Sequence, residues 1–282
     1  MTALTVAGLT LREASRRKVV WALLAMTVVL LALSAWGFSK LIGLDTELGT
    51  MTSGEARLVA SLLLNLILFG MSLIAAIGTA FLAGPTLAGE VESGIALSIM
   101  TRPVRRAAVL AGKWLGLVMF GGGFVVIAGL AQLVIVRATV DYWPPRPVTG
   151  LVLLAVQTAA LLTLGLLLST AISPMASGIV AVGLFGATWV AGIIGLVGEA
   201  LGNDSVARVG TISRMLLPTD GLWRGAMNAF QDPALLRQVG SGIEESPFLS
   251  MAPLTTTYLA WAGLWIAGVL ALAAMSFHRR DL

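Results

Sequence analysis

The chain has 282 residues, of which 57% are hydrophobic and 11% carry a charged side chain. Soluble domains average about 25% charged residues, and a soluble fold of this size cannot bury so much apolar surface. The composition therefore excludes a soluble enzyme, a nucleic-acid-binding domain and a disordered chain, and indicates a helical membrane protein. Cysteine is absent and His278 is the single histidine. Disulfides, metal sites built on Cys or His, and a Ser-His-Asp triad are thereby excluded.

Six apolar stretches are long enough to cross a bilayer as helices, which takes about 20 residues. In chain order they are 19–38, 58–82, 108–136, 148–172, 175–201 and 255–277. The stretches are continuously apolar, so the alternation of a membrane barrel is missing. The first is too long for a cleaved signal peptide and is expected to stay as a span. The predicted fold is all-α, a single polytopic transmembrane domain over residues 1–282.

The basic residues predict the orientation of the domain. With the N-terminus inside, ten Lys and Arg residues fall on the cytoplasmic side: Arg12, Arg16, Arg17, Lys18, Arg102, Arg105, Arg106, Lys113, Arg279 and Arg280. Most lie beside a span end, where the positive-inside rule has force, so both termini are predicted to be cytoplasmic. The preference for Arg over Lys, with abundant Ala, Gly and Val, suggests a prokaryotic genome and hence the cell (inner) membrane.

Two segments outside the spans have helical patterns. Residues 1–18 are predicted to form an elbow helix on the inner surface, with Leu4, Ala7 and Leu11 on one face; a disordered basic start is the alternative. Residues 202–254 are predicted to hold short amphipathic helices on the outer membrane surface, with an ordinary loop as the alternative. Their apolar residues at helical spacing are Leu222, Trp223, Ala226, Met227 and Phe230. Thr219 or Asp220 can cap that helix, and Asp232-Pro233 resembles a second helix start.

The connection 84–106, between the second and third spans, carries the functional signal. Glu90 and Glu92 follow the second span, which we expect to continue as a helix beyond the membrane, and Gly94 permits a turn. A short hydrophobic helix then has Ile95 and Ile99 on one face. Its basic end consists of Arg102, Pro103, Arg105 and Arg106. From charge alone, a solvated inner loop and a docking helix for a partner protein explain the segment equally well.

The order of residues in this connection resembles the membrane subunits of ABC-2-type transporters. Those subunits have an acidic Glu-x-x-x-Gly-Thr motif, a coupling helix, then Pro-Val-Ser-Arg and Gly-Lys. The matching residues are Glu90, Gly94, Pro103, Val104, Arg106, Gly112 and Lys113, whereas Ile95 and Arg105 depart from the motif. The stretch 217–224 and the ending 277–282 are also similar to the family, so the resemblance covers essentially the whole chain.

The resemblance implies a type V exporter-like permease that moves an amphipathic or hydrophobic substrate. The chain has no Gly-x-x-x-x-Gly-Lys-Ser/Thr loop, so ATP and Mg are expected on a separate ABC ATPase, present in two copies. The second permease would be another copy of this chain or a homologue, membrane lipid would surround both, and nucleic acid is not an expected partner. The coupling residues Glu90 to Arg106 would contact the ATPase. The alternatives are an intramembrane lipid-modifying enzyme, using Glu90 and Glu92 with the nearby arginines, and a non-transporting anchor or sensor.

The spans themselves contain no deeply placed acid or base, which argues against a proton relay or a charged ion filter. The resemblance places the second and fifth spans at a two-fold interface beside the transport path. The candidate residues for that path or interface are Asn65, Leu68, Phe69, Ser72, Val182, Gly183 and Gly186. Interhelical packing and hydrogen bonding within one subunit is the alternative role for all of them.

Overall fold

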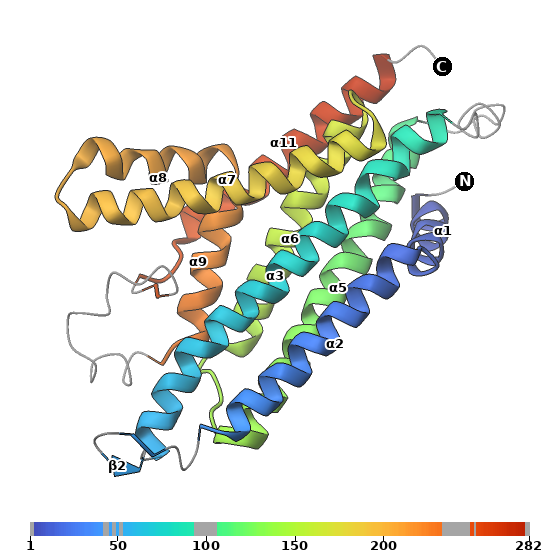
Figure 1. Ribbon diagram of the computed structural model, residues 1–282. Helices are drawn as coiled ribbons and strands as arrows, with labels where there is room; N and C mark the ends of the chain where they lie inside the picture. Colours follow the sequence, from blue (N-terminus) through green and yellow to red (C-terminus); the bar gives the residue numbers. More distant parts are fainter. Residues whose placement is uncertain are drawn as a thin grey trace.

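Among the residues that the computed structural model describes, six helices are long and apolar enough to cross a membrane, and they confirm the six predicted spans (Figure 1). They are α2 (Lys18–Ser39), α3 (Ser53–Glu92), α5 (Arg106–Val140), α6 (Pro147–Ser169), α7 (Pro174–Ala200) and α11 (Thr256–Arg279). The shorter elements are α1 (Ala3–Ser15), α8 (Asp204–Leu216), α9 (Thr219–Phe230) and the antiparallel strands β1 (Asp45–Thr46) and β2 (Gly49–Thr50). The structure describes residues 3–41, 45–46, 49–50, 53–92, 106–232, 249–250 and 252–279.

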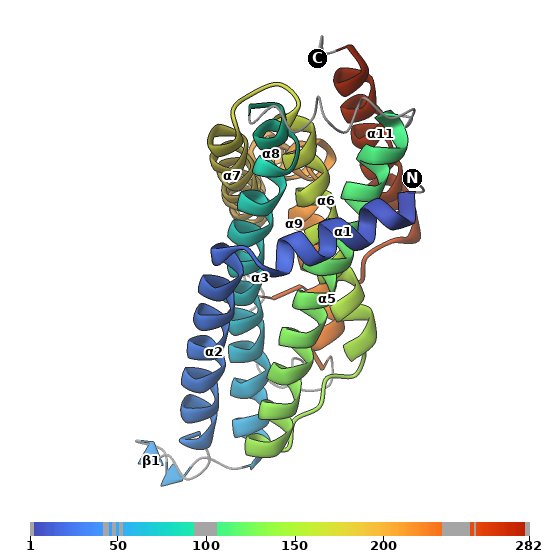
Figure 2. The same ribbon diagram turned by 90° about the vertical axis from the view of Figure 1, so that its right-hand side faces the viewer.

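Both chain termini lie at the same end of the helix bundle, which we call the terminal end (Figures 1 and 2). The ends of α3, α6 and α11 and the starts of α5 and α7 lie there too. The opposite end, the distal end, carries β1, β2 and the connection from α5 to α6. This up-and-down order is what short connections between antiparallel spans produce.

Helix α6 lies at the centre of the bundle and packs against α3, α5, α7, α9 and α11. In the most apolar stretch of α6, 67% of the residues are buried in the protein. The corresponding share is 22% for α2 and for α7 and 11% for α11. The main core therefore lies between α3, α5, α6 and α9, with Leu64, Leu133, Leu154 and Trp223 among its fully buried side chains. The poorly buried helices present their apolar side chains outward, as a surrounding bilayer requires.

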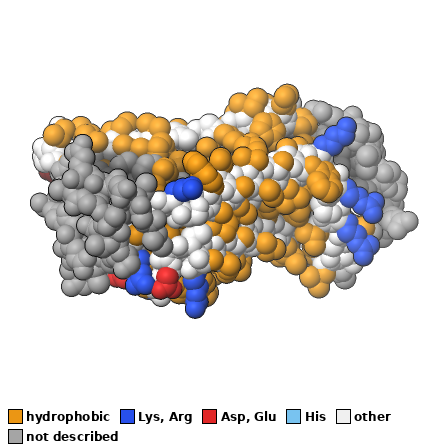
Figure 3. All heavy atoms as spheres, turned by 60° about the horizontal axis from the view of Figure 1, so that its bottom comes forward, with side chains coloured by type: hydrophobic (Ala, Val, Ile, Leu, Met, Phe, Trp, Pro, Cys, Tyr) orange, Lys and Arg blue, Asp and Glu red, His pale blue; other side chains and the backbone are white. Residues whose placement is uncertain are grey.

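The outer surface has the pattern of a membrane protein. Hydrophobic side chains cover the middle of the molecule, and Lys and Arg side chains gather toward its two ends (Figure 3). On α2, the exposed side chains of Trp21 and Trp36 lie near the two ends of the helix. Tryptophan favours the two membrane–water interfaces, so these two residues mark the boundaries of the apolar layer.

Helix α1 lies across the first turns of α5 (Figure 2), which confirms a helix in the predicted elbow segment. The predicted face is wrong, because Leu4 is exposed while Val6 and Thr10 are buried with Ala7. The reason is close backbone approach. A Cβ atom at Gly112 of α5 would lie 2.6 Å from the Ala3 carbonyl oxygen, and one at Gly116 would lie 2.6 Å from that of Ala7. Small residues, rather than the bulkiest apolar ones, therefore determine which face of α1 is buried.

A tight turn reverses the chain from α7 into α8. Gly202 has a φ of +64°, a conformation that glycine adopts without steric cost. The N–H of Asn203 donates to the Gly198 carbonyl, and the N–H of Gly202 donates to that of Glu199. These two bonds form a Schellman motif, which ends α7. The side chain of Asn203 then accepts bonds from the N–H groups of Ser205 and Val206 and so caps α8.

Helices α8 and α9 form a re-entrant pair, which returns to the middle of the bundle and then runs back to the distal end. A Cβ atom at Gly195 of α7 would lie 2.7 Å from Gly210, so α8 packs closely and antiparallel on α7. At the turn between α8 and α9, the hydroxyls of Thr219 and Thr188 are 3.2 Å apart, and Thr188 is near the middle of α7. The turn therefore lies within the depth of the spans.

Helix α9 is buried in the protein along nearly its whole length: every residue except Arg224 is buried. The predicted helix after Thr219 is thus confirmed, but its predicted position on the outer membrane surface is wrong. Its charged and amide side chains find partners inside the protein, so burial is possible on all sides. Asp220 pairs with Arg214, and Asn228 accepts a bond from Arg146. The second helix start predicted at Asp232-Pro233 falls at the edge of the described residues, since Pro233 lies outside them.

Candidate functional site

Helix α3 continues as one helix past the apolar part of its span, which ends at Thr86, to Glu92. Its 40 residues correspond to about 60 Å at 1.5 Å per residue, about twice the hydrocarbon thickness of a bilayer. The predicted continuation beyond the membrane is therefore confirmed. Glu90 and Glu92 are in its last turn, and Arg106 is the first residue of α5. The other predicted coupling residues, Gly94, Ile95, Ile99, Arg102, Pro103 and Arg105, lie outside the described residues.

The Gly112-Lys113 pair connects three helices at the terminal end. Because Gly112 has no side chain, the backbone of α1 packs directly against α5 at this position. Lys113 is buried, and its Nζ donates a hydrogen bond of 2.7 Å to the carbonyl oxygen of Thr86 in α3. A buried ammonium group is costly unless it is hydrogen-bonded, so this bond holds the side chain in place. The pair thus fixes α1 and the outgoing part of α3 to the start of α5.

An ionic cluster joins α7, α8 and α9 at the inner end of the re-entrant pair. Oδ2 of Asp220 accepts hydrogen bonds of 3.0 Å from Nε of Arg214 and from Nε of Arg224, and the Asp220 side chain is only 1% exposed. A Cβ atom at Gly192 would lie 2.4 Å from that same oxygen. Glycine is therefore required at position 192, because any side chain would displace the carboxylate. Arg224 also donates to the Gly192 carbonyl, at 3.1 Å.

The C-terminal carbonyls of the re-entrant pair are bonded by side chains of α11 and of the connection between α5 and α6. In α11, the Tyr258 hydroxyl donates to the Arg214 carbonyl at 3.0 Å and the indole N–H of Trp265 donates to the Leu216 carbonyl at 2.8 Å. At the distal end, the Tyr142 hydroxyl donates to the Phe230 carbonyl at 2.7 Å. Burial raises the pKa of Tyr142 to about 12, so its phenol stays protonated and remains a donor at any physiological pH.

The seven predicted path or interface residues divide into three groups. Asn65, Leu68 and Ser72 are buried within the chain, and the Ser72 hydroxyl donates to Oε1 of Gln157 in α6 at 3.1 Å. Gly183 is exposed and Gly186 partly so, with nothing within 4 Å of a Cβ atom placed at either. The first group therefore packs the bundle in this conformation, whereas these two glycines open a small-residue patch on the outer face of α7. Val182 and Phe69 are partly buried between these extremes.

Aromatic rings connect α3, α7 and α9 beside this patch. Phe69 stacks on Trp189 of α7 with ring centroids 4.7 Å apart and is tilted against Trp223 of α9 at 5.5 Å. Such pairs add about 0.5–1.5 kcal/mol beyond the area they bury. These ring contacts join α3 to α7 and to the re-entrant pair. Of the predicted path residues, only Phe69 joins the two spans in this way.

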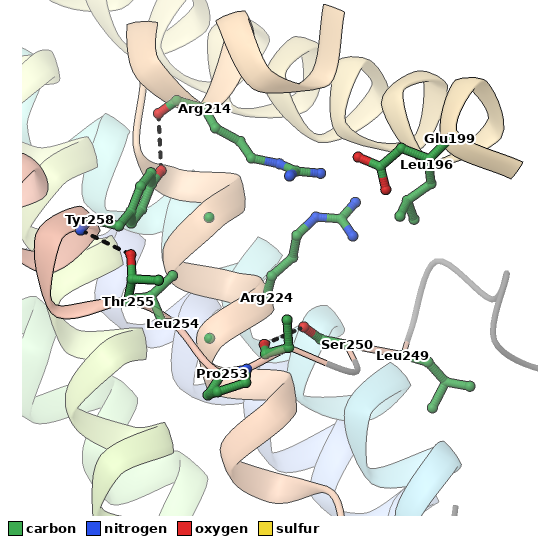
Figure 4. Close-up of a pocket in the computed structure, with 13 residues that line it drawn as sticks. Leu196, Glu199, Arg214, Arg224, Leu249, Ser250, Pro253, Leu254, Thr255 and Tyr258 are labelled. Carbon is green, nitrogen blue, oxygen red and sulfur yellow. Dashed lines mark hydrogen bonds between the residues drawn. The ribbon is translucent and has the colours of Figure 1, made fainter. Parts of the chain in front are cut away.

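A cavity of about 480 Å³ lies at the distal end between α7, α9 and the start of α11 (Figure 4). Arg214, Arg224 and Glu199 extend toward one another on one side of it, and Tyr258 lies on another. Its apolar lining comes from Leu196, Leu249, Pro253 and Leu254. Among the described residues, no group of three His, Asp or Glu side chains is placed to hold a metal ion.

A comparison of the sequence with known protein families shows the family to which the chain belongs. The sequence profile described as "ABC-2 family transporter protein" matches residues 4–282. The chain belongs to the ABC-2 transporter family. It is therefore the permease subunit of an ABC transporter, a multi-pass membrane protein and not itself the ATPase. Among curated individual proteins, none matches the permease.

Sequence reasoning missed the ionic cluster of the permease. Thr219, Asp220 and Trp223 were assigned only to the start and apolar face of a surface helix. Two signals were present in the sequence. The fifth span has Gly192, Gly195 and Gly198 at intervals of three. The segment after it holds two basic residues, Arg214 and Arg224, and the acidic Asp220 between them. Small residues at regular spacing indicate that another backbone approaches, but the sequence does not reveal which one.

We predict that Gly192→Ala destabilises the permease, because the new methyl group displaces Asp220 from both arginines. Overpacking in a filled core costs about 1–3 kcal/mol. The matched control is Gly268→Ala in α11, where nothing lies within 4 Å of the new Cβ atom; it should be neutral or slightly stabilising, since alanine is the better helix former. Apparent melting temperatures of the detergent-purified variants provide the measurement. Equal melting temperatures for both variants would contradict the assigned role of Gly192.

Proposed function

We propose that this permease exports an amphipathic or hydrophobic substrate and is driven by a separate ABC ATPase. The observation that supports the proposal best is the construction of the terminal end. Helix α3 extends beyond the span as a single helix to Glu92, and Lys113 ties it to α5 through the Thr86 carbonyl. A protein that binds the connection between α3 and α5 would therefore move both helices together.

The terminal end faces the cytoplasm in this proposal. Its described residues include the cluster Arg12, Arg16, Arg17 and Lys18 at the junction of α1 and α2. Basic residues beside span ends are retained on the cytoplasmic side of membrane proteins. That orientation gives an ATP-hydrolysing partner in the cytoplasm access to residues 84–106. In a prokaryotic cell, dependence on cytoplasmic ATP would imply the inner membrane.

The mechanism follows from the contacts of α3. ATP binding would bring two ATPase subunits together and move the connection that each one holds. Helix α3 would carry that displacement from Glu92 to the stack of Phe69 on Trp189, and so to α7. Rigid-body motion of packed helices around a central path is the general form of alternating access. The family relationship supports export, and the apolar outer face of α7 supports an amphipathic or hydrophobic cargo.

A second permease copy, or a homologue, would complete the path at the outer face of α7. Its exposed residues include a set at helical spacing, namely Ile179, Gly183, Val190, Ile194 and Val197. The uncovered Gly183 and Gly186 allow close approach of another helix, which is how membrane helices associate without a hydrophobic driving force. No acidic or basic side chain interrupts this face before Glu199.

The coupling proposal predicts that Glu90→Ala weakens the complex with the ATPase. Removing one member of a buried charge pair costs about 2–5 kcal/mol, whereas a rim charge mostly changes the salt dependence. The permease would be co-expressed with a Walker-motif ABC ATPase from the same genome, and co-purification and ATP hydrolysis would be measured. Glu13→Ala, which removes an exposed acid of α1 at the same end, is the matched control. If Glu90→Ala and Ile99→Asp both leave complex formation and stimulated hydrolysis intact, the connection is an ordinary loop.

The dimer proposal predicts that a single cysteine at Gly183 forms a disulfide between two permease copies in native membranes. The cysteine-free sequence makes any crosslink attributable to the introduced residue. Ile127→Cys is the control, because that residue is 71% exposed on α5, a helix that does not pack on α7. Equal crosslinking at both positions under mild oxidation would reject α7 as the contact surface.

A further inference from the structure

The distal cavity described above has the features of a binding site that the transport mechanism does not use. It is bounded by Glu199 in the last turn of α7 and by Tyr258 in the first turn of α11. Both residues lie where their spans end, which is the depth of lipid headgroups in a bilayer. The cavity extends inward from there to Arg214, near the inner end of α8.

The cavity wall carries two guanidinium groups that share one carboxylate. Arg214 and Arg224 both bind the same oxygen of Asp220 through Nε, and Arg224 makes one more bond, to the Gly192 carbonyl. Each guanidinium has five N–H donors, so most of their donors are not used by these bonds. Within the described chain, no other carboxylate lies within 4 Å of either group. Glu199 points toward the arginines from across the cavity (Figure 4).

Two converging arginines with one buried counter-charge favour an anion that offers several acceptor oxygens. Guanidinium groups bind phosphate with paired hydrogen bonds, more strongly than neutral donors bind it. Basic pockets between membrane helices on the cytoplasmic side bind anionic lipid headgroups, and the same pairing of guanidinium with phosphate applies at the distal end. The hydroxyl-bearing residues Ser250, Thr255 and Tyr258 supply further polar groups along the cavity.

The size and the apolar lining distinguish a lipid from a free anion. A volume of about 480 Å³ is in the range of sites for drug-sized ligands and exceeds what a phosphate ion fills. Leu196, Leu249 and Leu254 contribute hydrocarbon surface beside the arginines. We infer that this cavity binds an anionic phospholipid, with its phosphate on Arg214 and Arg224 and its glycerol and upper acyl chains along the leucines.

The test measures lipid retention on the detergent-purified permease alone by native mass spectrometry, so it does not rest on the proposed ATPase. Phosphatidylglycerol and phosphatidylcholine with identical acyl chains are the probes, and inorganic phosphate is added in a separate arm. Wild-type permease should retain phosphatidylglycerol about tenfold better, because the choline headgroup cancels the phosphate charge. Equal retention of the two lipids would overturn the inference.

Two variants and their controls locate the binding. Ala252→Trp fills the cavity from an exposed position and should reduce phosphatidylglycerol retention about tenfold, whereas Ala171→Trp, exposed at the terminal end, should not. Glu199→Gln should raise retention about threefold, because it removes a negative charge that lines the cavity and points toward the two arginines. Asp204→Asn removes the same charge from the start of α8, which does not line the cavity, and should change little. Retention that is identical in all four variants, or saturable binding of inorganic phosphate without preference for phosphatidylglycerol, would overturn the lipid assignment.

Discussion

The C-terminal ends of α8 and α9 leave carbonyl groups without a partner in their own helix, one at the depth of the spans and the other at the distal rim, and satisfying those groups constrains the rest of the distal half. In apolar surroundings each unpaired backbone group costs several kcal/mol. Helix α8 ends between α7 and α11, where Tyr258 and Trp265 supply the donors. Helix α9 ends at the distal rim, where the Arg146 N–H bonds the Ala229 carbonyl and Tyr142 bonds that of Phe230. These bonds determine how α11 and α6 pack around the pair.

The same pair explains why the permease carries buried charge although its spans carry none at mid-depth. Asp220 at the start of α9 is compensated by Arg214 and Arg224, and it needs Gly192 for space. Breaking such a cluster by removing one partner costs about 3–5 kcal/mol. The cluster therefore locks the pair onto α7, the helix that Phe69 connects to α3. The proposed ATPase-binding connection at the terminal end and the cavity at the distal end are thus connected through the contact between α3 and α7.

Local sequence patterns predicted the spans well because each is a long, continuous apolar run, and run length decides whether a helix crosses a bilayer. The helix at Thr219 was predicted for a similar reason, since its apolar residues recur at helical spacing. The location of this helix was not predictable, because amphipathic spacing identifies only its apolar face. The spacing does not reveal which residues of the protein bind the polar side chains on its opposite face. Asn65 and Leu68 are candidate path residues because the resemblance places their span beside the transport path, and only the packing of α3 in the bundle reveals that both are buried. The buried face of α1 escaped prediction because Gly112 and Gly116 favour small residues over Leu4.

The depth of the turn between α8 and α9 is the central claim, and nickel accessibility of spin labels in vesicles measures it directly. Leu216, at the inner end of α8, is 70% exposed, so it faces either lipid at depth or water at a surface. Single cysteines at Leu216 and at Asp204, in the exposed first turn of α8, would each carry a nitroxide label. A re-entrant α8 predicts low access of a water-soluble nickel chelate at position 216 and high access at 204. Equal, high access at both positions would place α8 on the membrane surface and contradict the re-entrant arrangement.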